Sequence, residues 1–447
     1  MKKSLAISLI AVGFLGSVNT FAAEDMSSMF KDGKVSGQIR MFSIDREYQG
    51  SAGNTLHRNG TALGGHLKFE TADYEGLSFG TALYTTNRIA SSPTIDATLF
   101  GKNNDGYSIL GEAYVQYKYG KTTFKGGRQK LDTPLAGSDD ARMLPNLFEA
   151  YLLINTDIPN TTLIAGHVTK FAQGTFGRVY TNTSVANQLL SVTSGYSYVD
   201  PQNQVGDFVK MGEYAIGQST DGVSVASATY APNKNIKAQV WDYYAYDILN
   251  AVYGQVDLSW KCLLTDKIHP FFSAQFIKED EVGDKLAGKV DGMYWGAKFG
   301  AKVENLTAYV AYSQTGANNA AEAAAGGLAN AIITPWGGMP AYTQGMVTRH
   351  QFIAGTKAAK VAATYNFKDL GANVKATAYY TSFDMDANSG YGIARTATEP
   401  GFDIIYNPEV VKNLQLRLRG NFPRKFAETA SGDTGWDEYR FIVNYNF

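Results

Sequence analysis

The chain has 447 residues and a net charge of -1, with 18% charged and 13% aromatic residues. A near-neutral chain lacks the cationic surface that binds nucleic acid, and the lone Cys262 excludes an internal disulfide or a multi-cysteine metal site. Because the composition does not shift along the chain, and because aromatic-rich, charge-poor chains tend to form sheets, we predict one large all-β body.

The first 22 residues have the pattern of a secretion signal. Two lysines precede an apolar run from Leu5 to Val18, and Thr20-Phe21-Ala22 supplies the small residues that signal peptidase prefers. The alternative is a membrane anchor, but a spanning helix needs about 20 apolar residues and this run is shorter. We therefore predict a signal peptide over residues 1–22 and one mature domain over residues 23–447, with no transmembrane helix.

The predicted strands alternate between apolar and polar residues. In the first of them Val35, Ile39 and Met41 oppose Ser36, Gln38 and Arg40, and the same division recurs at 252–260, 292–303 and 414–419. Successive side chains of a strand point to opposite sides, so each strand has one apolar and one polar face. Many segments run to about ten residues, the length that a tilted strand needs to cross a bilayer, whereas sandwich strands average about five or six.

Short and long connections alternate along the chain. Short turns such as 73–76 and 232–235 are separated by longer segments at 45–62, 131–146, 171–221, 316–346 and 384–399. This rhythm is typical of outer-membrane barrels, and it predicts about eighteen antiparallel strands with both termini in the periplasm. The stretch 171–230 could hold one strand or two. We interpret the Ala/Gly-rich segment 317–331 as a loop, with a short helix as the alternative.

A block that begins at Gly127 is the most specific feature of the sequence. Gly127-Arg128-Gln129, Leu131-Asp132-Thr133-Pro134 and the run from Asp139 to Glu149 resemble the third-loop region of the OprD family of outer-membrane porins. Glu112-Ala113-Tyr114 and Gly37-Gln38-Ile39-Arg40 also resemble strands of that family. The resemblance implies a transmembrane β-barrel, an inward-folded third loop that constricts the pore, and an arginine-rich wall that guides small solutes, often carboxylates.

The composition of residues 131–146 is compatible with such a constriction. Acidic Asp132, Asp139 and Asp140 are mixed with Arg142 and two prolines, which restrict the conformation of a loop. Without the resemblance, an external loop with solvated charges would be favoured. With it, we predict an inward-folded third loop in which Asp139 or Asp140 faces the basic wall and produces a transverse field.

The polar strand faces carry more cations than carboxylates. Each charge alone could be a merely solvated one, but the collective sign favours anions or carboxylate-bearing solutes, because a guanidinium group matches a carboxylate. The residues predicted to line the solute pathway are Arg40, Arg128, Asp139, Asp140, Arg142, Arg417, Arg419 and Arg440.

The last strand ends the chain with an aromatic residue. Odd positions from Tyr439 to Phe447 are all apolar, which resembles the C-terminal signal that barrel insertion machinery recognises. The alternative is an ordinary amphipathic edge strand. A long, exposed aromatic edge would promote aggregation in a soluble protein, whereas closure of a barrel removes the edge.

Enzymatic interpretations have little support in the sequence. None of the five histidines lies in a nucleophile motif, and we predict no cofactor and no metal site, although Ca²⁺ binding by a loop stays open. We predict a porin in the outer membrane of a Gram-negative bacterium, surrounded by lipid, through which small water-soluble solutes diffuse passively. The alternative is a surface barrel whose long loops bind a host or partner molecule. A monomer and a trimer both remain possible.

Overall fold

The computed structural model describes residues 23–49, 55–91, 93–139, 142–175, 206–338, 340–389, 394–429 and 432–447. The predicted signal peptide and Asp140 therefore lie outside the described residues. The helical segments are α1 (Met26–Lys31), α3 (Met211–Ile216), α4 (Ala320–Ala324) and the 3-10 turns η2 (Ala97–Leu99), η3 (Lys102–Asn104), η4 (His350–Phe352) and η5 (Phe367–Leu370). Within the described residues, no helix is long and apolar enough to cross a membrane.

Strands make up most of the described chain. The first half contains β1 (Lys34–Gln49), β2 (Thr55–Glu70), β3 (Leu77–Ala90), β4 (Tyr107–Tyr119), β5 (Thr122–Gln129), β6 (Leu147–Asn155), β7 (Thr161–Ala172), β8 (Val209–Lys210), β9 (Val223–Asn233) and β10 (Ile236–Ala245). The second half contains β11 (Leu249–Ser259), β12 (Ile268–Glu281), β13 (Asp291–Val303), β14 (Leu306–Thr315), β15 (Lys357–Asn366), β16 (Val374–Met385), β17 (Arg395–Tyr406), β18 (Leu414–Asn421), β19 (Ala427–Thr429) and β20 (Gly432–Asn446).

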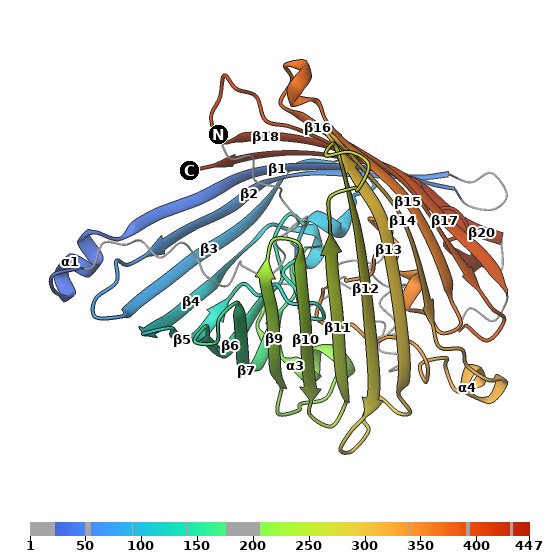
Figure 1. Ribbon diagram of the computed structural model, residues 1–447, viewed down its shortest axis with the longest axis horizontal. Coiled ribbons are helices and arrows are strands. Elements are labelled where there is room, and N and C mark those ends of the chain that lie inside the picture. The colour runs from blue at the N-terminus through green and yellow to red at the C-terminus, as the bar shows by residue number, and fades with distance from the viewer. Residues whose placement is uncertain are drawn as a thin grey trace.

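The strands close into a barrel. The described residues form one 20-stranded sheet, in which β8 and β19 are short additions of 2 and 3 residues, so the other 18 strands form the ring. Every neighbouring pair is antiparallel, and β1 pairs with β2 on one side and with β20 on the other. Figure 1 shows the blue first strands beside the red last ones. The predicted strand number and antiparallel closure are confirmed.

The two faces of the wall have the predicted chemistry. On β13, Met293, Trp295 and Phe299 are exposed on the outer surface, whereas Tyr294 between them is fully buried on the inner side. Tyr439 on β20 and Phe447, the residue after this strand, belong to the same exposed apolar stripe. A wide apolar outer surface is stable in hydrocarbon, so the outer face of the wall is suited to lipid.

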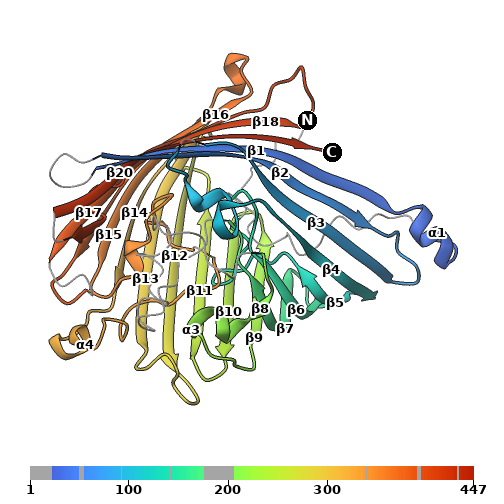
Figure 2. The same cartoon turned by 180° about the vertical axis from the view of Figure 1, so that it is seen from behind.

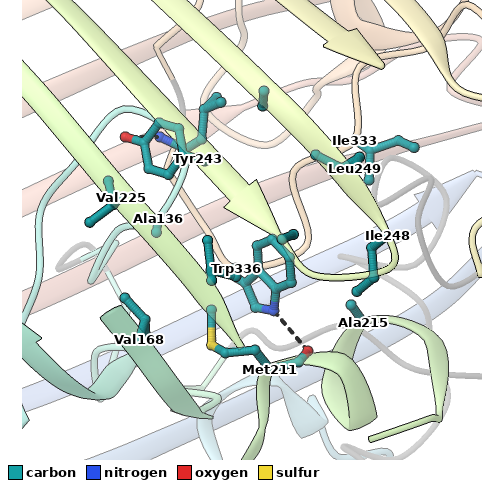
Figure 3. Close-up of a cluster of buried hydrophobic side chains, with 14 of the residues drawn as sticks. Ala136, Val168, Met211, Ala215, Val225, Tyr243, Ile248, Leu249, Ile333 and Trp336 are labelled. Atoms are coloured by element: carbon teal, nitrogen blue, oxygen red, sulfur yellow. Dashed lines mark hydrogen bonds between the residues drawn. The ribbon is translucent and has the colours of Figure 1, made fainter. Parts of the chain in front are cut away.

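Three long connections at one end of the barrel supply segments that pack inside it. They are loop L3 (residues 130–146), loop L4 (173–222) and loop L7 (316–356). Both ribbon views show much of their described course within the ring of strands, whereas α4 of L7 projects away from it (Figures 1 and 2). Trp336 of L7 lies in a buried apolar cluster and donates a hydrogen bond from Nε1 to the carbonyl oxygen of Met211, at 3.1 Å (Figure 3). The lumen on this side is therefore a packed core.

Two expected connections differ from the structure, and the sequence leaves a third stretch open. The segment 45–62 is mostly strand, because Asp45 pairs with Asn59 and Tyr48 with Leu56, so the polar ends of β1 and β2 extend the ladder beyond the apolar band. The segment 317–331 contains the short helix α4, which Asn319 caps with its side chain. Between β7 and β9, where the sequence allowed one strand or two, the described residues 173–175 and 206–222 contain only the two-residue β8 and α3.

Closure predicts an unusual resistance to detergent. We expect the purified protein to stay folded in SDS at room temperature and to migrate differently after boiling, because no free strand edge is available from which unfolding could start. Gel electrophoresis with and without heating measures this. Equal mobility in the two samples, together with a helical circular dichroism spectrum, would contradict the closed barrel.

Candidate functional site

Loop L3 folds into the lumen, as predicted, and its own hydrogen bonds define its shape. The backbone N–H of Asn146 donates to the carbonyl oxygen of Ser138 at 2.8 Å, and the Asp132 carboxylate accepts from the backbone N–H of Ser138 at 3.1 Å. Leu135 and Ala136 at its tip belong to the same buried cluster as Trp336. The loop is thus held by bonds at its base and by apolar packing at its tip.

L3 and L7 are clasped together inside the barrel. The backbone N–H of Gly137 donates to the carbonyl oxygen of Trp336 at 3.2 Å. Gly337 and Gly338 have φ of 78° and 75°, and a Cβ atom on Gly338 would overlap the carbonyl oxygen of Pro134. Only glycine combines this backbone conformation with so close an approach. This contact joins the two loops into one unit that narrows the lumen.

Asp139 faces loop cations and not the strand wall. Its carboxylate lies 2.9 Å from the Arg142 guanidinium and 3.7 Å from that of Arg349 on L7. For Asp139, a local ion-pair cluster between the two loops therefore takes the place of the expected pairing with the basic wall, while Asp140, the other candidate for that role, lies outside the described residues. Arg349 was not identified from the sequence, because nothing in its neighbourhood marks it and only the fold of L7 brings it to Asp139.

Four of the predicted arginines line the lumen on adjacent strands. Arg417 and Arg419 lie on the inner face of β18, and Arg419 is the register partner of Arg440 on β20 and of Asp403 on β17. Arg417 forms two hydrogen bonds with Asp403, one of them 2.7 Å long, and Arg419 lies 3.8 Å from the same carboxylate. One carboxylate thus balances two guanidinium groups.

Arg40, the fourth of these arginines, joins the wall to L3. Its Nε donates to the Asn444 side chain on β20 at 2.8 Å, and its terminal nitrogen donates to the backbone carbonyl of Arg142. The Arg142 side chain in turn donates to the carbonyl oxygen of Thr175 at 2.8 Å. The structure therefore brings Arg40, Arg142 and Asp139 together, and both arginines also fix the position of L3.

Arg46 is a lumenal arginine that the sequence reasoning missed. It is almost fully buried on β1, 2.9 Å from Asp96 of the loop 91–106, and it also pairs with Glu438 on β20. Glu438 pairs with Arg440 as well. The alternation that placed Arg40 inward would have found Arg46 six residues later, had the segment from Asp45 not been interpreted as a connection.

Arg128 does not lie in the lumen. On β5 it shares the outward face with Phe124, and its register partner Glu149 lies on the same face as the exposed Tyr151. Its guanidinium is 4.0 Å from Glu149 and 4.4 Å from the ring centre of Phe208. The motif suggested a pathway residue, but strand parity places this arginine on the outer surface, and we leave it out of the pathway.

A cavity of about 330 Å³ lies between L3 and the inner faces of β1 to β5. Its ionisable lining comprises the cations Lys34, Arg40, Lys68, Lys118, Lys125 and Lys130 and the acids Glu70, Asp73, Glu112 and Asp132. Lys68 pairs with Glu70 at 3.2 Å and Glu112 at 3.3 Å, while the Lys125 ammonium lies 3.8 Å from the ring centre of Tyr114. The lining of this cavity is polar, and it has more cationic than acidic side chains.

Comparison with known proteins gives one family. The family described as outer membrane porin, OprD family, matches residues 28–447. The chain matches none of the curated protein sequences with which it was compared.

Several solved structures share the fold. Pseudomonas aeruginosa OpdK with vanillate has a TM-score of 0.73 at 16% identity, and a BenF-like porin from Pseudomonas fluorescens Pf-5 has 0.74 at 17%. Pseudomonas aeruginosa OccK2 (OpdF) in complex with glucuronate has 0.70 at 16%. Each match covers 94% of this chain and 99% of the other. The protein belongs to the OprD family of porins in the outer membrane of Gram-negative bacteria.

Proposed function

We propose that the barrel is a passive channel for small water-soluble solutes and that it prefers anions, in particular those bearing a carboxylate. The observation that carries this proposal is the arginine group on β18 and β20, in which Arg417 and Arg419 share the single carboxylate of Asp403. A guanidinium group forms paired hydrogen bonds with a carboxylate, so a row of incompletely neutralised guanidinium groups is a track for such solutes.

The charges in the rest of the described lumen also support a preference for anions. Among the described residues of L3, Asp139 is paired with both Arg142 and Arg349, so its carboxylate is balanced by cations. The cavity below L3 also has more cations than acids. Fixed charges beside a narrow aqueous path act on every passing ion, so their sum decides which sign of charge enters more readily.

The ligands named for two of the similar structures belong to one chemical class. Vanillate and glucuronate, which accompany OpdK and OccK2 (OpdF), are both carboxylates. Identities near 16% carry over the fold, and the class of solute fits the arginine group described above. We further propose that residues 1–22 direct export and are removed, so that the mature domain comprises residues 23–447.

A planar bilayer experiment tests the channel and its selectivity together. We expect discrete openings and a reversal potential of the sign that anion preference gives under a salt gradient, because the lumenal charge is positive in excess. Cation preference would refute the selectivity. An absence of openings would favour the rival function, a surface barrel whose loops bind a partner.

Charge reversal at β18 tests the arginine group. We expect Arg417→Glu combined with Arg419→Glu to shift the reversal potential towards cations. The shift should shrink at high salt, because the Debye length is only about 8 Å at physiological ionic strength. Arg128→Gln is the control, since Arg128 lies on the outer face, and it should leave the reversal potential unchanged. A folded double variant with the parent's reversal potential at low salt would remove both residues from the pathway.

The terminal residue tests recognition by the insertion machinery. Phe447 exchanges two backbone hydrogen bonds with Gly37, of 2.9 and 3.0 Å, and its ring is half exposed. We expect its deletion to reduce the amount of barrel in the outer membrane more than it weakens barrel refolded in detergent, because one apolar side chain contributes only about 1.5 to 3 kcal/mol. Phe441→Ala removes a ring from the same stripe and should reduce membrane levels less. Unchanged levels after the deletion would make Phe447 merely part of a strand.

A further inference from the structure

Part of L7 runs around the inside of the barrel from β12 to β17. We call this part, residues 333–338 and 340–348, the strap. Inward-facing polar side chains of the wall bond to it along its course, and most of these bonds go to its backbone. The wall residues concerned are Gln275, Glu279, Ser313, Lys360, Thr381 and Glu399. A loop inside a lumen needs partners for its backbone groups, and here the wall supplies them.

The first attachment is on β12. The fully buried carboxylate of Glu279 accepts a hydrogen bond from the backbone N–H of Ile333 at 2.7 Å. Four residues earlier on the same face of β12, the amide of Gln275 donates to the carbonyl oxygen of Pro340 at 2.8 Å and accepts from the backbone N–H of Tyr342 at 3.1 Å. The Gln275 side chain thus both donates to and accepts from the strap backbone, as the backbone of a paired strand would.

The middle attachments come from three successive strands. The hydroxyl groups of Ser313 on β14 and Thr343 lie 2.6 Å apart, and the Thr381 hydroxyl on β16 donates to the carbonyl oxygen of Thr343. The ammonium group of Lys360 on β15 donates to the carbonyl oxygen of Gln344 at 2.6 Å. Lys360 is an inward-facing cation, but its ammonium group bonds to the strap.

The last attachment, Glu399 on β17, makes the most bonds. Its fully buried carboxylate accepts from the backbone N–H groups of Met346 at 2.7 Å, Thr348 at 2.9 Å and Val347 at 3.3 Å. The Tyr379 hydroxyl donates to it as well. Of the other attachments described above, none makes more than the two bonds of Gln275. Glu399 is therefore the strongest single attachment of the strap.

We propose that Glu399 is the positioning residue that holds the strap in the lumen and so fixes the width of the pore. The inference rests on the proposed channel function. The strap is joined to L3 by the bond from Gly137 to Trp336, and Arg349, one residue beyond its end, faces Asp139 at 3.7 Å. Releasing the strap from β17 therefore loosens both constricting loops and not L7 alone.

The first test is Glu399→Gln. Glutamine keeps one acceptor oxygen, but its NH₂ group is a donor. This group cannot accept hydrogen bonds from the backbone N–H groups of the strap, so some of them lose their acceptor. We expect faster hydrogen exchange at Met346, Val347 and Thr348 in detergent-solubilised protein. In bilayers we expect conductance to rise about twofold or more, with passage of larger sugars in liposome swelling, because the constriction widens.

A second variant reaches the same attachment from the loop. A Cβ atom on Gly345 would overlap the Glu399 carboxylate, so Gly345→Ala should displace the strap without altering any wall residue. Glu281→Gln is the matched control. Glu281, on β12, likewise accepts from a backbone N–H, that of Val290 at 3.0 Å, but it holds the loop 282–290 and not the strap. We expect it to leave both measurements unchanged.

The outcomes separate the two proposals. If Gly345→Ala and a folded Glu399→Gln keep the parent's exchange rates and conductance, the role of Glu399 is refuted. If Glu399→Gln does not fold, Gly345→Ala decides alone. Effects of the same size in Glu281→Gln would also refute the role of Glu399, since they would indicate a general loosening of the barrel. If the parent protein forms no channel, the proposed function fails, and the exchange rates still decide whether Glu399 holds the strap.

Discussion

The pairing of β1 with β20 is the interaction on which the other features depend. An unpaired backbone N–H or C=O group costs several kcal/mol in hydrocarbon, so a sheet can cross a membrane only when it has no free edge. The register that joins Gln38–Gln49 to Gly435–Asn446 removes that edge. Closure also encloses a lumen, and every inward-facing polar side chain must then be solvated or find a partner in a loop.

The lumenal wall divides this task between two regions that meet at β17. From β12 to β17, inward polar groups bind the backbone of the strap, and Glu399 is the last of them. From β17 through β18 and β20 to β1, the inward groups include arginines, and Asp403 is the first carboxylate to balance them. Glu399 and Asp403 lie four residues apart on one face of one strand, so the boundary between the loop attachments and the arginine group is sharp.

Strand parity made the wall predictable, while loop contacts were not. Arg417, Arg419 and Arg440 were placed inward correctly, because apolar neighbours at alternate positions determine the face of a strand. Arg128 was placed by its motif, although the apolar Phe124 four residues earlier has the same parity and indicates the outer face. Nothing local marks Arg349 or Glu399, because their partners come from segments distant in sequence that meet only after the loops enter the lumen.

The observed pairs change how the charge of the pore should be understood. A transverse field requires an acidic surface opposite a basic one, and Asp139 or Asp140 was expected to provide the acidic side. In the structure, Asp139 lies between Arg142 and Arg349, so one carboxylate balances two cations on the loops, as Asp403 does on the wall. Among the described residues, the loop side and the wall side of the lumen thus each have two guanidinium groups beside one carboxylate. Under the proposed channel function, such an arrangement would discriminate by net charge and by width, and it would orient a dipolar solute much less than opposed charges would.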